Sequence, residues 1–212
     1  MISLKIFVFN AFQVNTYILY NDSKECIIID PGCSTQEEFN VIDAFIKENK
    51  LKPIAYYNTH CHIDHVVGNC FIDKYYKIPL GVHKAGLSFL KTSKITGLAF
   101  GFHIEKVVKP ALFLNDGDEV KFGNSVLKVL YTPGHVNGSV CFYSEKDKFV
   151  IVGDVLFHHG IGRTDFPTGD YDLLISSIKN KLLTLPDSTT VYPGHGESTT
   201  IGDERRFNPY LK

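Results

Sequence analysis

The segment Thr59-His60-Cys61-His62-Ile63-Asp64-His65 contains three imidazoles and one carboxylate within six residues. Imidazole nitrogens and carboxylate oxygens are ligands for Zn²⁺ and for other first-row metal ions. His60 and His62 are two residues apart in an expected extended segment, so their side chains point to the same side. Asp64 and His65 are adjacent at the expected start of a helix and point elsewhere. The spacing therefore favours two metal sites over one, and no structural role requires such a cluster on a loop.

Three further ligand candidates each follow an expected strand, and each is directly preceded by a glycine. A single histidine after a glycine would be an ordinary turn residue, but three such strand-end positions in the same chain as the cluster indicate additional ligands. The complete candidate set is His60, His62, Asp64, His65, His135, Asp154 and His195.

The elements that must position these residues follow from hydrophobic periodicity and turn residues. Strands are expected at 4–9, 16–20, 26–29, 53–57, 80–83, 119–122, 126–131, 139–143, 149–152 and 190–192. Helices are expected across 39–46, with Ser34 or Thr35 as the cap, and at about 64–76 and 170–185. Each half of the chain thus has strands first and helices after. This order favours an α/β fold in which two mixed β-sheets pack face to face with helices outside, an αββα sandwich.

Composition limits the class of protein. Hydrophobic residues make up 44% and charged residues 21%, as in globular proteins, and the net charge of −1 gives no electrostatic footprint for nucleic acid or for an anionic membrane. Five cysteines without a CxxC pair are typical of reduced thiols, and residues 2–12 lack the basic start of a signal peptide. We therefore expect a cytoplasmic protein with one domain over 1–212, because no linker or internal repeat interrupts the chain.

The order and approximate spacing of these motifs resemble the metallo-β-lactamase superfamily over nearly the whole chain. The resemblance implies the αββα sandwich, with the metals at one edge where the two sheets meet. It assigns His60, His62 and His135 to a first metal, and Asp64, His65 and His195 to a second, with Asp154 bridging the two. It also implies that Asp30 orients metal-bound histidines. The commonest subclass of true β-lactamases carries a cysteine where Asp154 stands, which argues against that subclass.

Within the superfamily, Gly162-Arg163-Thr164-Asp165-Phe166, Thr184-Leu185-Pro186 and the tail over 199–209 resemble the glyoxalase II group, and most closely its short, single-domain bacterial hydrolases. Glyoxalase II hydrolyses S-D-lactoylglutathione, a thioester, to D-lactate and glutathione. Long members add a C-terminal helical domain that binds glutathione. Only 17 residues follow His195 (212 − 195), so that domain is not expected here. Arg163 falls where the long enzymes have a glutathione-contacting lysine, and we expect it to bind substrate or to form a structural ion pair.

The implied cofactor is a pair of divalent ions, zinc first, with iron or manganese as alternatives. Two nearby ions convert a bridging water to hydroxide near neutral pH and polarise the carbonyl that it attacks. Asp64 and Asp154 are the expected catalytic carboxylates. A thiolate, with a pKa of about 8.5, leaves with little acid assistance. The expected partner is a small-molecule thioester substrate, and we expect neither nucleic acid nor a membrane to bind. The protein is expected to be a monomer or a homo-oligomer.

Two other activities fit the same resemblance. Mononuclear iron persulfide dioxygenases share the fold and similar segments, but they end the last motif with Ala-His-Asp-Tyr and use two histidines and one aspartate. The Gly194-His195-Gly196 sequence favours hydrolysis. A lactonase is a further alternative, and a metal-storage domain is disfavoured because no ligand position is lost. His83 and His103 are expected to be turn or surface residues, and Cys61 to serve packing. His158 and His159 follow Asp154 closely enough to reach the pocket, but they are expected to lie outside the ligand set.

Overall fold

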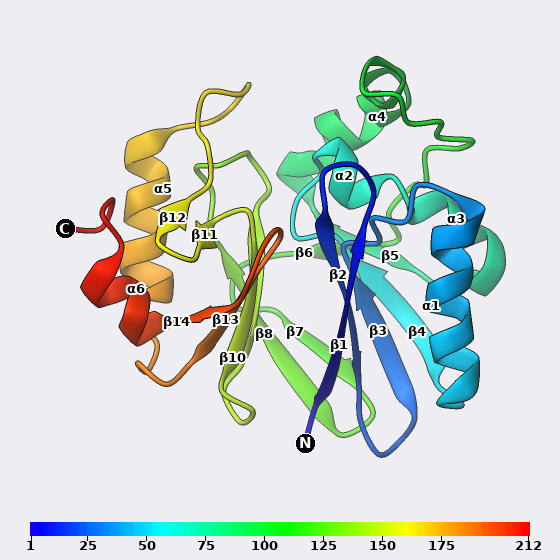
Figure 1. The fold of residues 1–212 in the computed structure, drawn as a ribbon, viewed down its shortest axis with the longest axis horizontal. Coiled ribbons are helices and arrows are strands. Elements are labelled where there is room, and N and C mark those ends of the chain that lie inside the picture. The colour runs from blue at the N-terminus through cyan, green and yellow to red at the C-terminus, as the bar shows by residue number, and fades with distance from the viewer.

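The computed structural model describes residues 1–212 and has four layers, with helices outside two face-to-face sheets (Figure 1). In spatial order, the first sheet contains β1 (Ser3–Phe9), β2 (Val14–Tyr20), β3 (Glu25–Ile29), β4 (Lys52–Tyr57), β5 (Leu80–His83) and β6 (Leu112–Leu114). The second contains β14 (Thr199–Thr200), β13 (Thr190–Pro193), β10 (Phe149–Gly153), β9 (Val140–Ser144), β8 (Ser125–Tyr131) and β7 (Glu119–Phe122). Both sheets mix parallel and antiparallel pairs, which confirms the predicted fold class.

The helices divide between the two outer faces. Along the chain, four helices occur between the strands of the first sheet: α1 (Gln36–Glu48), α2 (Ile63–Val66), α3 (Asn69–Tyr76) and α4 (Leu87–Ala99). Helix α4 begins after a 3₁₀ turn at Lys84–Gly86. The second sheet carries α5 (Tyr171–Ser177), a wider π-helical turn at Ile178–Leu182, and α6 (Ile201–Phe207). In Figure 1, α1 and α3 lie outside the first sheet, and α5 and α6 lie outside the second. None of the helices is both long and apolar enough to cross a membrane.

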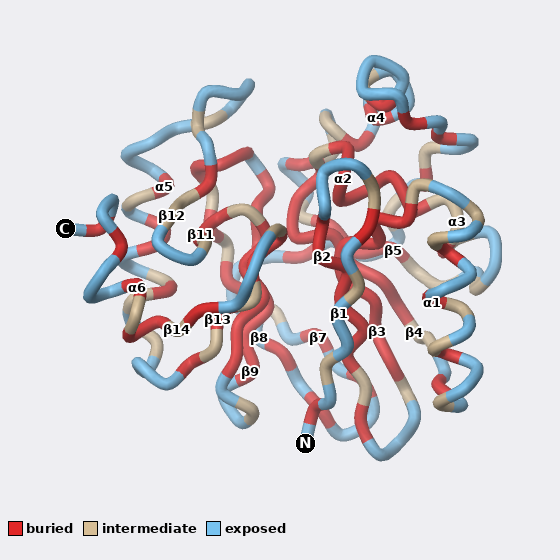
Figure 2. Tube along the Cα trace, viewed as in Figure 1, coloured by how far each residue is buried: buried red, intermediate tan, exposed pale blue.

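The alternation of side chains along the strands produces three apolar layers. In β10, Phe149 and Ile151 face the first sheet, whereas Val150 and Val152 pack in the outer layer with Leu174 of α5. The buried strand β3 alternates in the same way between the inter-sheet layer and the layer beneath the first sheet's helices. Figure 2 shows this burial as nearly continuous red along the central strands. Strands buried on both faces explain why their sequences are continuous apolar runs.

Several elements differ from the sequence-based expectation. The helix expected at about 64–76 is two helices, because the Gly68 N–H bonds to the Pro31 carbonyl at 2.9 Å and the chain changes direction there. Helices α4 and α6, the strand β6 and the β11–β12 hairpin (Leu156–Phe157 with Gly160–Ile161) were not predicted. The cap of α1 is Thr35, whose hydroxyl accepts a hydrogen bond from the Glu38 N–H at 3.2 Å.

Replacing Phe142 with alanine should destabilise the protein strongly, because its ring is fully buried between the two sheets against Tyr57. We expect the free energy of unfolding in urea to fall by about 3–5 kcal/mol. Phe113→Ala, at a half-exposed position on β6, is the matched control and should cost less than about 1 kcal/mol. Equal losses for the two variants would contradict the assignment of this layer as the core between the sheets.

Candidate metal centre

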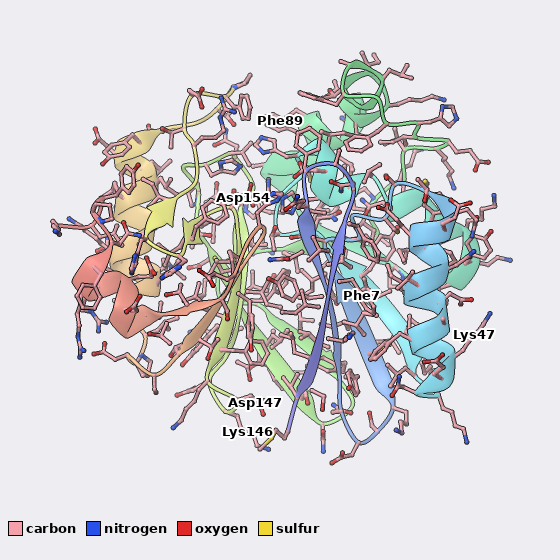
Figure 3. All side chains as sticks on the ribbon, viewed as in Figure 1. Phe7, Lys47, Phe89, Lys146, Asp147 and Asp154 are labelled. Atoms are coloured by element: carbon pink, nitrogen blue, oxygen red, sulfur yellow. The ribbon has the colours of Figure 1, made fainter.

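The seven predicted ligand residues meet at one edge of the sandwich, just beyond the ends of strands. The segment after β4 and the short helix α2 supply four of them from the first sheet. The β8–β9 loop and the ends of β10 and β13 supply the other three from the second. In Figure 3, Asp154 lies at the same end of the sandwich as Phe89, and the Lys146–Asp147 turn lies at the opposite end. The residues brought together are His60, His62, Asp64, His65, His135, Asp154 and His195.

The first group contains His60, His62 and His135, whose ligand atoms all lie within 4.8 Å of one another. The His62 Nδ1 atom is 2.9 Å from the His135 Nε2 atom, and the His60 ring centre is 4.8 Å from that of His62. Three imidazole nitrogens converging on one point form one face of a tetrahedral metal site.

The second group contains Asp64, His65 and His195. The Asp64 Oδ2 atom is 3.1 Å from His195 Nε2 and 3.5 Å from His65 Nε2. The Asp154 carboxylate lies between the groups: its Oδ1 is 3.3 Å from His65 Nε2, and its Oδ2 is 3.8 Å from His135 Nε2. One carboxylate is therefore within reach of ligands from both groups, which is the position of a bridging residue.

Hydrogen bonds from the far side of the rings fix their orientation. The Nδ1–H groups of His135 and His195 donate to the carbonyl oxygens of Arg163, at 2.7 Å, and Phe12, at 2.9 Å. The His65 Nδ1–H donates to the Asp30 carboxylate at 3.0 Å. A histidine that donates from Nδ1 keeps the lone pair of Nε2 free, and here the Nε2 atoms point inward.

Asp30 is the hub of this supporting network. Its buried carboxylate accepts hydrogen bonds from the Thr59 N–H at 2.7 Å and the Thr59 hydroxyl at 2.6 Å, besides the one from His65. Because the Thr59 proton is used in this way, its oxygen is the acceptor for the His60 Nδ1–H at 3.1 Å. Asp30 therefore contacts one histidine of the second group directly and one of the first group through Thr59.

Two glycines allow the segments to approach closely enough for the ligands to meet. A Cβ atom on Gly194 would collide with the Asp154 carboxylate and the His65 ring, and one on Gly162 would collide with the Asp154 carbonyl. Backbone pairing joins the two sheets at the same place, since the Asn15 N–H donates to the Gly194 carbonyl at 2.7 Å.

The two groups differ in electrostatic character. Burial lowers the pKa of His60 and His135, and it lowers that of His62 to about 4, so these imidazoles are neutral. Burial acts in the same direction on His65, but the Asp64, Asp154 and Asp30 carboxylates outweigh it and hold the pKa of His65 well above its usual value. The first group is thus a neutral nitrogen site, and the second is a carboxylate-rich site whose negative charge favours a cation, either a proton on His65 Nε2 or a metal ion in its place.

The donor set fits a bound cation. Three inward-facing atoms, His60 Nε2, His65 Nε2 and Asp154 Oδ1, are buried without any hydrogen-bond partner in the protein. Such atoms are rare in folded proteins and call for an occupant such as an ion or water. Carboxylate oxygens and imidazole nitrogens without protons are the chemistry that divalent first-row ions prefer.

A cavity of about 590 Å³ opens onto the metal centre. Besides the ligand side chains it is lined by Phe12, Cys61, Ile63, Phe89, Thr92, Ser93, Thr96, Phe100, Arg163, Phe166 and Pro167. No local sequence pattern indicates that aromatic rings from such distant segments meet here, although Phe166 belongs to the Gly162–Phe166 motif.

Arg163 lies on the cavity wall as expected for a substrate-binding residue, but its charge is already paired. Its guanidinium donates twice to the Asp165 carboxylate, at 2.7 and 2.6 Å, and stacks on the Phe166 ring at 3.7 Å. The same hydrogen bonds lower the pKa of Asp165 to about 2, so the pair stays ionised. Of the two readings that the sequence allowed, the structure contains the ion pair.

The other histidines lie outside this cluster. His83 stacks on Tyr131 with ring centres 4.2 Å apart, and His103 is exposed. His158 and His159 form a separate exposed group with Asp203, and His158 also contacts Glu197 at 2.7 Å. Cys61 is buried, as expected for a packing residue, although it also borders the cavity.

A family model described as the metallo-β-lactamase superfamily matches residues 9–195 of the chain. The chain belongs to the metallo-β-lactamase superfamily. Relatives of this superfamily member include a probable metallo-hydrolase, YqgX, of Bacillus subtilis, which is 40% identical over 94% of this chain and 92% of its own. The hydroxyacylglutathione hydrolase GloC of Haemophilus influenzae is 35% identical over 99% of this chain and 98% of its own. The protein is therefore a metallo-hydrolase of this superfamily.

Solved structures agree with this assignment. The BLEG-1 B3 metallo-β-lactamase is 36% identical, covers 99% of this chain and 100% of its own, and superposes with a TM-score of 0.88. TTHA1623 in a di-iron-bound form is 34% identical over 98% and 100%, with a TM-score of 0.87. ETHE1 from Myxococcus xanthus is 26% identical over 98% and 83%, with a TM-score of 0.79. Both the fold and a divalent metal centre follow from membership in this superfamily.

Replacing Asp30 with asparagine should weaken metal binding without removing the side chain's shape. The amide loses the charge that His65 faces and one of the acceptors that hold Thr59, so we expect metal affinity to fall by about 10–100-fold. Chelator competition followed by elemental analysis measures this. Asp43→Asn on the surface of α1, where the carboxylate pairs with Lys47, is the control and should bind metal like the wild type. Unchanged affinity in Asp30→Asn would contradict the orienting role.

Proposed function

We propose that this metallo-hydrolase is a binuclear thioesterase of the hydroxyacylglutathione hydrolase type. The observation that carries the proposal is the pair of three-residue groups with Asp154 within reach of both. Seven ligand residues exceed what one ion of four to six coordination can use. In this proposal His60, His62 and His135 hold one ion, and Asp64, His65 and His195 hold the other, with zinc as the first expectation. The di-iron form of TTHA1623 keeps iron as an alternative.

Bound divalent ions would supply Lewis acidity, which polarises a thioester carbonyl and acidifies a water molecule. Asp154 and Asp64 serve this chemistry in different ways. The Asp154 carboxylate, whose pKa the surrounding histidines hold far below its usual value against the effect of burial, remains an acceptor that can orient a water proton. The Asp64 carboxylate, 3.1 Å from His195 Nε2, balances the charge of the second group.

No side-chain nucleophile is needed for this reaction. Cys61 is the thiol that borders the cavity, but burial raises its pKa to about 12, so it stays protonated and unreactive at neutral pH. A thiolate leaving group, with a pKa of about 8.5, departs without a dedicated general acid. Water attack with a thiolate leaving group therefore matches the groups that the site offers.

The relative from Haemophilus influenzae supports the thioester as the substrate class, because it is named a hydroxyacylglutathione hydrolase and aligns along nearly its whole length. A persulfide dioxygenase is the second candidate. Iron in a structure 34% identical to this chain supports an iron enzyme, although that form holds two irons and the dioxygenase uses one. The complete second ligand group favours hydrolysis, because a mononuclear iron site uses only two histidines and one aspartate. A lactonase is a third candidate for the same centre.

One experiment separates these candidates. Protein purified without chelator is analysed for metal and assayed with S-lactoylglutathione, glutathione persulfide under oxygen, a lactone and the β-lactam nitrocefin. The proposal expects two divalent ions per chain and thioester hydrolysis. One iron per chain with oxygen consumption on the persulfide would replace it with the dioxygenase, and turnover confined to the lactone or to nitrocefin would replace the thioester as substrate.

Replacing Asp154 with alanine should abolish turnover and remove metal from at least one group, because the variant loses the carboxylate that both groups share. We expect kcat to fall by at least about 10³-fold, measured together with metal content. His83→Ala is the control: it removes an imidazole that lies outside the cluster, so its rate should stay within a few-fold of the wild type. Equal rates for wild type and Asp154→Ala would refute the bridging role.

A further inference from the structure

We propose that the cavity beside the metal centre binds an uncharged, apolar group of the thioester substrate, in place of a charged carrier such as glutathione. This inference rests on the proposed thioesterase function and adds the substrate class. Its basis is the chemistry of the cavity wall, and it revises the expectation that Arg163 binds a substrate carboxylate.

The wall is built from four phenylalanines that come from separate parts of the chain. Phe12 lies in the β1–β2 turn, Phe89 on α4, Phe100 at the end of α4 and Phe166 in the loop before α5. The Phe12 and Phe100 rings meet edge to face, with centres 5.7 Å apart. Phe89 and Phe166 each lie within 6 Å of the His62 ring, at 5.6 and 5.7 Å. The aromatic wall is therefore continuous with the metal centre.

Two of the three hydroxyl groups in the wall, those of Thr92 and Ser93, are already bonded to the backbone. The Thr92 hydroxyl donates to the Phe89 carbonyl at 3.1 Å, and the Ser93 hydroxyl donates to the Leu90 carbonyl at 2.8 Å. Both donors are thus consumed by the backbone of α4. The helix presents methyl groups and rings to the cavity, and it presents no hydrogen-bond donor from these two residues.

The charges on the wall do not suit an anion. Apart from the metal-centre histidines, Arg163 is the one cationic side chain that lines the cavity, and two of its N–H groups are bound to Asp165. Glutathione carries two carboxylates at neutral pH. A carboxylate placed next to this pair would meet no unbalanced positive charge to compensate for the hydration it loses, because Asp165 already neutralises the guanidinium. An apolar group has no charge hydration to lose in the same position, and its burial contributes favourable free energy.

The volume of about 590 Å³ falls within the range of small-molecule sites. It has room for an alkyl or aryl group together with the thioester itself. The group can belong to the acyl part or to the thiol part of the substrate, and the chemistry of recognition is the same for both. The two sources are distinguished by experiment.

The test uses two homologous series with the metal-loaded protein. In the first, acetyl, butyryl and hexanoyl groups are carried on N-acetylcysteamine. In the second, a lactoyl group is carried on ethanethiol, butanethiol and hexanethiol. The series whose chain enters the cavity should gain about fourfold in kcat/KM for each methylene, and its longest member should exceed S-lactoylglutathione at least tenfold. Two flat series, or a tenfold preference for S-lactoylglutathione, would overturn the inference.

Two variants on α4 connect the preference to the cavity. Thr96→Phe adds a ring inside the cavity and should lower kcat/KM for the longest substrate at least tenfold, with less than a threefold change for the shortest. Ile95→Phe is the matched control, since the neighbouring side chain is three-quarters exposed and lies outside the cavity, and it should leave both rates unchanged. Parallel losses on long and short substrates in Thr96→Phe would count against the proposed pocket.

Binding without turnover keeps this inference separate from the proposed function. S-hexyl-N-acetylcysteamine and S-methyl-N-acetylcysteamine are thioethers that cannot be hydrolysed, and calorimetry compares their affinities. The hexyl compound should bind at least 50-fold more tightly. If it does so while no thioester is hydrolysed, the pocket stands and the thioesterase proposal fails. Equal affinities refute the pocket whatever the catalytic result.

Discussion

The junction of the two sheets holds buried polar atoms that the protein itself does not satisfy, and the surrounding structure is arranged to hold them there. A buried polar atom without a partner costs about 1–3 kcal/mol, and three such atoms converge at this one edge. The fold tolerates them because the two histidine rings that carry two of these atoms are supported from behind, His65 by Asp30 and His60 by Thr59. The rigid strands behind these supports leave the inward atoms no alternative partner, so the site is preorganised for cations.

Sequence patterns predicted most of this arrangement because the relevant signals are local. The seven ligands stand in the loops that follow strands or in the short helix α2 next to one of them, and the strands themselves are apolar runs, so the sandwich and the cluster follow from short segments. Helix α4 was missed because its apolar residues are spread around the helix and no side chain caps its first turn at Gly86. The aromatic cavity was missed for another reason: Phe12 and Phe166 are 154 residues apart (166 − 12), and no local pattern reports that they share a wall. For Arg163 the sequence allowed either substrate binding or a structural ion pair, and the three-dimensional structure was needed to identify the pair with Asp165.

The apolar wall and the charged centre affect each other. Coulomb interactions strengthen as the effective dielectric constant falls, and rings such as Phe89, next to His62, exclude water from one side of the centre. The β1–β2 turn serves both features at once, because Phe12 contributes its ring to the cavity and its carbonyl to His195. A change in that turn would alter substrate contacts and ligand orientation together, so recognition and metal geometry are coupled in this fold.

The division of the ligands between the two sheets also determines when during synthesis the centre can form. His65 precedes His195 by 130 residues (195 − 65), and at typical translation rates this separation corresponds to roughly ten seconds. During that interval the emerging chain exposes the imidazoles and the carboxylate of its early motif without the partners that complete either group. Full coordination becomes available only after β13, the strand that precedes His195, has joined the second sheet. Occupancy of the centre would therefore mark a chain whose two halves have already assembled.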